Sequence, residues 1–383
     1  MVKRYTKTVA NTPMKRILAI AQTSDFRNFT RRYTFEAIAK LYKGVDAICY
    51  SSIKNLFSAR NYSEFMNVYS YYRVVPEKLI LRNGIIKQLE NVNLKIGYKR
   101  IFDRYDIFIF SSPIHSLFKP YCNGAKIFII SDPYHLMGYD YKCENELIKS
   151  ADVIFTTSKN LKHVYLPKYF NYHNEKNVHY WPNCVDIDVW SYEKLTKFRR
   201  KSQMIVIGFA GNFMEIVDLD LLEHVVTKFP DYEFQFAGKI TASRTDVEFS
   251  NKLRSIFEKP NVKYMGYYPF DDIPKVVINW DVCMMIDNKS ELSSYHHHNK
   301  LYQYLALGKP VVINRNHNDY DEFRNLIFIS NDYAEFVENI NRAVRLIDDR
   351  EYIKRAIKAA EENSTTVRAR QFLTVLRNEN ILF

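Results

Sequence analysis

A lysine and a glutamine three residues apart open the part of this sequence that is best suited to chemistry. Lys300 and Gln303 fall in the run HHHNKLYQYLALGKPVVI at 296–313, and their spacing puts them on one face of a helix. The N-terminus of a helix carries unbonded N–H groups and a partial positive charge. With Lys300 in the first turn and Asn299 beside it, this end is expected to bind a diphosphate. The alternative is a solvated lysine, which the helix dipole disfavours.

Three consecutive histidines, His296–His298, precede this helix and suggest a metal site. Adjacent residues on a loop do not converge easily on one ion, and no carboxylate has the expected spacing, so we expect no metal. His298 is expected instead to contact the sugar or phosphate part of a ligand.

Side chains at the ends of strands in the first half of the chain are candidates for acid–base chemistry. Asp132 follows the apolar run KIFIIS and is the expected general base, although an Asp-Pro pair is also an ordinary turn. Asp25 is the other carboxylate, but nearby arginines favour an ion pair for it. His115, beyond the run YDIFIFS, is a second candidate for the base or for a residue that binds the acceptor.

The elements that must position these residues can be read from hydrophobic spacing. Leu301, Tyr304 and Leu305 have helical spacing, and Gly308 suits a left-handed helix end. Pro310 prevents further helix, and Val311–Ile313 is typical of a buried parallel strand. The segment therefore predicts a loop, a helix and a strand in succession.

The remainder of the chain alternates strands and helices twice. Strands are expected at 17–21, 45–50, 105–111, 126–131, 153–157 and 178–181, then at 204–209, 233–236, 262–265, 282–286 and 326–329. Helices are expected at 31–42, through most of 55–100, and at 144–150, 160–166, 219–228, 246–257, 273–278, 333–346 and 350–378. The charged stretch 192–202 is the expected linker. This pattern predicts an α/β protein with two Rossmann-like, doubly wound domains that face a central cleft.

Ligands of such sheets bind at the carboxyl ends of the strands. In the second half these ends carry Gly211, Asn212, Gly238, Lys239, Gly266, Tyr267, Tyr268, Asp287 and Asn288. Gly211 and Asn212 would offer backbone N–H groups to a phosphate. The two tyrosines could stack on a base or pack in the core, and Asp287 could bind sugar hydroxyls or form a turn. Neither a GxGxxG motif nor a Walker A loop is present, which disfavours dehydrogenases and P-loop kinases.

Three segments resemble the GT-B glycosyltransferases. SADVIFTTS at 150–158 with WPNCVDIDVW at 181–190 looks like the end of an acceptor domain, GFAGNF at 208–213 like the start of a donor domain, and NKLYQYLALGKPVV like the donor-site helix. The resemblance implies an acceptor-binding domain at 1–195, a nucleotide-sugar-binding domain at 196–360, and a C-terminal helix at 361–383 that packs back on the N-terminal domain.

Within this fold, Lys300 and Gln303 look most like the K-x-x-Q pair of the xanthan-type glucuronosyltransferases. That similarity implies a UDP-sugar donor, no further cofactor, and a base at Asp132. The larger retaining families carry two glutamates eight residues apart at this helix, where this chain has Tyr295 and Gln303. Their absence favours inversion of the sugar's configuration.

Composition constrains the partners. The net charge of +12 suits an anionic substrate, an anionic membrane surface or nucleic acid, and it can equally be an ordinary basic surface. Five scattered cysteines and the lack of a long apolar run favour the cytoplasm, with the inner face of the cytoplasmic membrane as the alternative location. The expected acceptor is a glycan or a lipid-linked glycan. A phage-type DNA glycosyltransferase and a GT-B module without activity are the alternatives. A basic rim of Arg27, Arg31 and Arg32 could meet an anionic acceptor.

Overall fold

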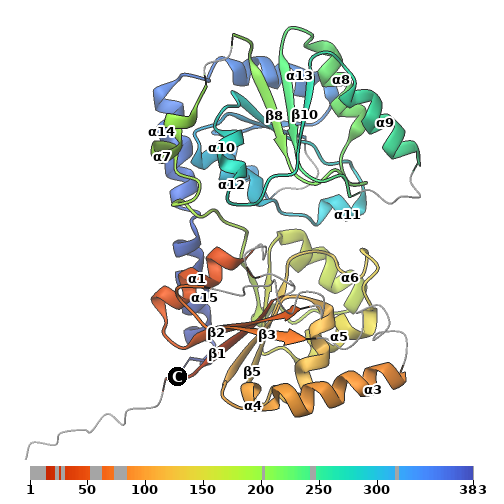
Figure 1. The fold of residues 1–383 in the computed structure, drawn as a ribbon, viewed down its shortest axis with the longest axis vertical. Helices are drawn as coiled ribbons and strands as arrows, with labels where there is room; N and C mark the ends of the chain where they lie inside the picture. Colours follow the sequence, from red (N-terminus) through yellow and green to blue (C-terminus); the bar gives the residue numbers. More distant parts are fainter. Residues whose placement is uncertain are drawn as a thin grey trace, which may run out of the picture. The chain divides into compact units, whose positions relative to one another are not determined.

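The computed structural model describes residues 14–21, 26, 31–51, 63–72, 84–200, 203–241, 247–314 and 319–382. Contacts divide the chain into two compact units. Unit 1 is Met1–Ile129, Asp140–Ile154 and Ala369–Phe383, and unit 2 is Ile130–Tyr139 and Phe155–Arg368. The two units are described separately below (Figure 1).

The first sheet has seven strands in the order β3-β2-β1-β4-β5-β6-β7. Their bounds are Ile17–Ala21 (β1), Val45–Ser51 (β2), Val68–Tyr72 (β3), Ile107–Phe110 (β4), Ala125–Ile130 (β5), Val153–Thr156 (β6) and Val178–Tyr180 (β7). β1 pairs in parallel with both β2 and β4. Parallel strands joined by helices make this a doubly wound sheet, as expected.

The helices that accompany this sheet are α1 (Arg32–Leu41), α3 (Gly84–Asn93), α4 (Lys99–Phe102), α5 (Tyr141–Ser150) and α6 (Leu166–Phe170), with π-helical turns at Leu94–Tyr98 and Leu161–Tyr165 and a 3₁₀ helix at Pro113–Tyr121. The expectation that most of 55–100 is helical was wrong for β3, which pairs in parallel with β2. The valine and tyrosines of VYSYY favour a strand, but β3 is a short edge strand whose side chains are mostly half-buried, so it lacks the buried apolar run that marks the other strands.

The second sheet has six strands in the order β10-β9-β8-β11-β12-β13. They are Val206–Ala210 (β8), Glu233–Ala237 (β9), Val262–Gly266 (β10), Val282–Met285 (β11), Val311–Asn314 (β12) and Phe328–Ser330 (β13). The accompanying helices are α7 (Tyr192–Leu195), α8 (Leu219–Lys228), α9 (Val247–Phe257), α10 (Ile273–Val277), α11 (Glu291–Ser294), α12 (Asn299–Ala306), α13 (Tyr333–Val344), α14 (Arg350–Glu361) and α15 (Thr365–Asn378).

Each face of this sheet buries its own hydrophobic core, because successive side chains of a strand point to opposite faces. On β8, Val206 and Ala210 pack with α12 and α14, whereas Ile207 and Phe209 pack with α8, α9 and α13. Gly208 lies against Trp280, and a Cβ there would approach the indole ring to 1.9 Å. Helices therefore cover both faces of the sheet (Figure 1).

Two expectations about element boundaries were wrong. The expected linker contains α7, whose N-cap Ser191 accepts a hydrogen bond from the backbone N–H of Lys194. The helix expected at 350–378 is broken into α14 and α15, because Ser364 forms a β-bridge with Val185 and the Thr365 N–H donates to the Val185 carbonyl. A strand-like contact with a residue far away in the sequence thus interrupts a segment whose residues otherwise favour helix.

The compact units do not follow the division expected at residue 195. Unit 2 includes the last residue of β5, the loop after it with Asp132, the last residues of β6, and all of the second sheet. The chain end from Ala369 belongs to unit 1, where the Lys15 ammonium donates to the Ile381 carbonyl at 2.7 Å. Among the described residues, no helix is both long and apolar enough to span a bilayer.

Candidate functional site

Three glycines bring the carboxyl ends of β8, β9 and β10 close together in unit 2. The N–H of Gly211 donates to the Ala237 carbonyl, and the N–H of Gly238 donates to the Gly266 carbonyl, both at 2.8 Å. A Cβ on Gly238 would lie 1.8 Å from the Gly211 carbonyl oxygen. Only glycine fits at position 238, so the backbones of β8, β9 and β10 approach one another closely at the edge of the sheet where ligands bind, here called the glycine edge.

Lys300 extends from the first turn of α12 to this glycine edge. Its Nζ lies 4.4 Å from the centre of the Phe209 ring, and a Cβ on Gly211 would approach Nζ to 2.7 Å. Burial lowers the pKa of Lys300, and the charge of Asp287 opposes that shift. α12 has no side-chain cap at its N-terminus. A cation and a helix N-terminus therefore lie together at the carboxyl end of β8.

Asp287 follows β11 and is paired with His298. The His298 Nε2 and an Asp287 carboxylate oxygen form a short ion pair, and the Asp287 N–H donates to Asn314 Oδ1 at 3.0 Å. Burial alone would raise the pKa of Asp287, but His298, Lys300 and His296 together lower it. Asp287 is therefore a buried carboxylate that holds the residue before α12, a role that sequence reasoning did not foresee.

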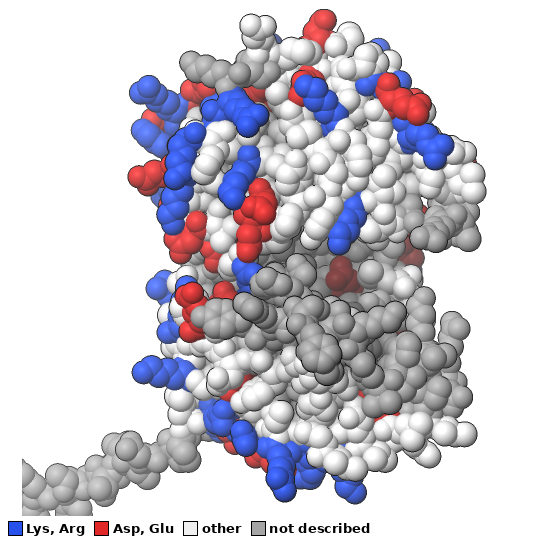
Figure 2. All heavy atoms as spheres, in the orientation of Figure 1, with Lys and Arg blue, Asp and Glu red and all other residues white. Residues whose placement is uncertain are grey.

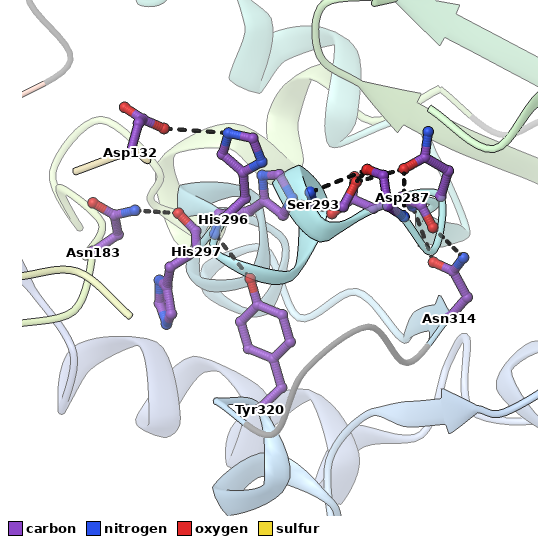
Figure 3. A network of polar contacts seen from close by, with 11 residues as sticks. Asp132, Asn183, Asp287, Ser293, His296, His297, Asn314 and Tyr320 are labelled. Carbon is purple, nitrogen blue, oxygen red and sulfur yellow. Dashed lines mark hydrogen bonds and ion pairs between the residues drawn. The ribbon is translucent and has the colours of Figure 1, made fainter. Parts of the chain in front are cut away.

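Asp132 lies beside His296, as Figure 3 shows. The His296 Nε2 is 3.4 Å from Asp132 Oδ1, and its ring is stacked on that of His298 with centres 6.1 Å apart. Burial lowers the pKa of His296, and Asp132 opposes this shift. His296 is 8% exposed, and its Nδ1 has no hydrogen-bond partner among the described residues. The structure thus connects Asp132 to the Lys300 end of the site through two histidines.

His297 faces the opposite way, into the core. Its ring stacks on Tyr302 at 5.7 Å between ring centres, and its carbonyl accepts a hydrogen bond from Asn183. The next residue, His298, donates its N–H to the Tyr320 hydroxyl at 2.8 Å. In extended backbone alternate residues share a side, so His296 and His298 point together and His297 points away. Sequence reasoning missed His296, although this alternation could have indicated it.

A hydrogen-bonded cluster around Glu291 holds the histidine loop against α6. One Glu291 carboxylate oxygen lies 2.5 Å from Lys168 Nζ and accepts from the hydroxyls of Tyr169 and Tyr295 at 2.8 and 3.0 Å. Nearby, Asn160 Nδ2 donates to the Ser294 carbonyl at 2.9 Å. Lys168, followed by Tyr169, lowers the pKa of Glu291. These contacts fix the short α11 from which His296–His298 emerge.

The other residues predicted to bind the ligand follow β8, β9 and β10 or lie on α12. The Lys239 ammonium lies 4.1 Å from the centre of the Tyr267 ring, which is half exposed. Tyr268 packs against the core on the α12 side of the sheet, and Gln303 is buried on α12. Asn212 is exposed beyond β8, and Asn299 is the first residue of α12. The roles expected for these residues stay predictions.

His115 and the expected basic rim belong to unit 1. His115 is buried in the 3₁₀ helix Pro113–Tyr121, where its Nδ1 accepts the Ser111 N–H at 3.2 Å, and its proposed role stays a prediction. Arg31 and Arg32 are buried by the packing of α1, which corrects the expectation of an exposed rim. Asp25 and Arg27 lie outside the described residues. Within the described part of the chain, no cluster of three or more His, Cys, Asp or Glu could hold a metal ion.

Comparison with known proteins supports the same fold. No protein-family model matches the chain. A segment of 172 residues is 30% identical to TuaH of Bacillus subtilis, whose name assigns it to teichuronic acid biosynthesis as a glycosyltransferase. The match covers 44% of this chain and 42% of TuaH, so the chain matches less than half of that relative's length.

Solved structures that match almost the whole chain include HepE and a sucrose-phosphate synthase. HepE from Anabaena, in complex with UDP and glucose, has a TM-score of 0.69 at 14% identity and covers 95% of this chain and 99% of its own. Sucrose-phosphate synthase from Thermosynechococcus elongatus has a TM-score of 0.72 at 11% identity and covers 95% of this chain and 98% of its own. The chain has the GT-B fold, with two parallel-sheet Rossmann-like domains.

Proposed function

We propose that this protein is a glycosyltransferase that moves a sugar from a UDP-sugar to a hydroxyl group of a glycan or a lipid-linked glycan. The observation that carries the proposal is the line of polar side chains from Lys300 through Asp287, His298 and His296 to Asp132. The name of TuaH and the UDP complexes of HepE support a nucleotide-sugar donor.

In this mechanism the diphosphate of the donor binds at the N-terminus of α12. The bond between the sugar's anomeric carbon and the diphosphate oxygen breaks, and its electron pair leaves with UDP. The negative charge that develops there is stabilised by the Lys300 ammonium and the first N–H groups of α12, so no metal is required. Gly211 lets the diphosphate and the lysine come close to the backbone, because no Cβ stands in between.

Asp132 accepts the proton of the attacking hydroxyl as the new bond to the anomeric carbon forms. Its carboxylate is partly exposed, with 36% of its side-chain surface accessible, so an acceptor can reach it. His296 holds that carboxylate from the buried side. Attack from the face opposite the leaving group inverts the configuration, and the pair of glutamates typical of retaining families is replaced by Tyr295 and Gln303.

The test is UDP release from a panel of UDP-sugars, with and without glycan and lipid-linked acceptors, in metal-free buffer. Wild type should release UDP from one donor, and Asp132→Asn should lower turnover at least about 100-fold while donor binding persists. NMR of the product should show the inverted anomer. A retained anomer would contradict inversion, and full activity of Asp132→Asn would remove Asp132 as the base.

A further inference from the structure

One helical face in unit 1 exposes a continuous row of apolar side chains. α3, the π-helical turn Leu94–Tyr98 and α4 follow one another without a break from Gly84 to Phe102. Along them Ile85, Leu89, Val92 and Ile96 are 71%, 56%, 53% and 80% exposed. Spacings of four, three and four residues put these four side chains on one face of the helix, here called the exposed stripe.

The opposite face of the same helical segment is firmly anchored. Glu90, Leu94 and Phe102 are buried. The Asn93 side chain donates to the Tyr72 carbonyl at 3.0 Å, and the Tyr98 hydroxyl accepts the Tyr72 N–H at 2.9 Å. These bonds to β3 fix the rotation of the helix about its axis. The exposed stripe is therefore turned outward by the packing of unit 1, and it is not a frayed end.

Cations accompany the stripe. Lys95 and Lys99 come three residues after Val92 and Ile96, which places them on the same side of the helix. Arg100 and Arg104 are also exposed. Lys99 is ion-paired with Asp103 at 2.6 Å and Glu90 is fully buried, so the excess positive charge beside the stripe comes from Lys95, Arg100 and Arg104. Figure 2 shows Lys and Arg side chains gathered along the lower edge of the molecule, around α4.

We propose that this segment docks the protein on an anionic lipid surface. The exposed stripe would enter the boundary between headgroups and acyl chains, and the flanking lysines and arginines would meet lipid phosphates. An apolar face bordered by cations fits this partner better than a second copy of the chain, because the second copy would bring the same positive charges. The inference goes beyond the proposed function and does not depend on it.

The experiment is co-sedimentation of the full chain with vesicles of phosphatidylcholine, with and without phosphatidylglycerol. Wild type should bind the phosphatidylglycerol vesicles and be released by salt. Ile85→Ser with Ile96→Ser should lower the bound fraction about tenfold, and Lys95→Glu with Arg100→Glu should do the same. The matched control is Val164→Ser with Val247→Ser, which changes two exposed valines in unit 2 and should bind like wild type.

Three results would overturn the proposal. Wild type could stay in the supernatant with both vesicle types, the Ile85→Ser/Ile96→Ser variant could bind as well as wild type, or the control variant could lose as much binding. Analytical ultracentrifugation tests the alternative occupant, which is a second copy of the chain. If wild type is a dimer and the Ile85→Ser/Ile96→Ser variant is a monomer, the exposed stripe is a self-association surface. Circular dichroism of each variant confirms folding before the comparison.

Discussion

His296 connects the expected base with the donor end of the site. Its Nε2 faces Asp132, its ring stacks on His298, and it is buried. A neutral imidazole in this place can orient the Asp132 carboxylate and leave it able to accept the proton of the attacking hydroxyl. Burial favours that neutral form by lowering the pKa of His296. We therefore assign His296 a positioning role under the proposed mechanism.

The prediction for His296 concerns rates more than binding. His296→Ala should lower kcat about 10- to 100-fold and leave KM for the UDP-sugar within a few-fold, because the donor is held by Lys300 and not by His296. His296→Gln keeps a polar N–H group beside Asp132 and should recover part of kcat. Steady-state kinetics on both variants test this. An equal rise in KM for both, with kcat intact, would contradict the role.

At the scale of residues, the sequence indicated individual candidates for the site but not the side chains that contact them. The places of Lys300 at the start of α12 and of Asp132 just after β5 could be predicted, because strand ends and helix starts follow from hydrophobic spacing, and their roles stay predictions. The pairing of Asp287 with His298 could not, since they are 11 positions apart on either side of the short helix α11 and no local pattern fixes their distance. The same holds for the contact between Asp132 and His296, which are 164 positions apart in the chain.

The glycine edge of the second sheet is the element on which the site depends. Gly238 has φ +149° and lies against the backbone of Gly211, whereas Gly266 has φ +74° and open space around it. Gly238→Ala should therefore destabilise the protein by about 3 kcal/mol or more, because the clashing atoms are backbone and cannot rotate away. Gly266→Ala should cost only about 1 kcal/mol for its left-handed backbone. Urea denaturation of both variants tests the difference, and equal losses would contradict it.

Lys309, just after α12, ties two loops together from inside the core. Its buried ammonium donates to the carbonyls of Ile278 and Trp280 at 2.8 and 2.5 Å. Burial lowers its pKa from 10.5 to about 8. The unfolded chain binds the proton more tightly than the folded one between these values. The contribution of Lys309 to stability is therefore complete above pH 10.5 and is lost as pH falls to about 8.

Lys309→Met should remove this pH dependence. The difference in the free energy of unfolding between wild type and variant should change by about 3 kcal/mol across that window, in favour of wild type as pH rises. Denaturation at several pH values measures the difference, in which tyrosine titrations common to both proteins cancel. A difference that stays constant with pH would contradict the buried lysine's role.

At the scale of the whole molecule, hydrophobic alternation was enough to predict the two doubly wound sheets. β1 and α8 have the bounds expected for them, and Gly308 has the left-handed φ of +64° expected at the end of α12. β3 was missed because it is a short edge strand with mostly half-buried side chains and no buried apolar run, and the break at Ser364 was missed because a distant residue, Val185, causes it. Tertiary contacts of this kind override local preference and leave no local signal.

The most direct measurement of the central claim is the thermal shift of the protein with UDP, compared between wild type and Lys300→Ala. A ligand at 100 times its Kd stabilises the folded state by about 2.7 kcal/mol, so the shift is readable without knowing the sugar or the acceptor. We predict a clear rise in Tm for wild type and little or none for Lys300→Ala, with Lys239→Ala intermediate. The same rise in wild type and Lys300→Ala, or no rise with any nucleoside diphosphate, would contradict the account.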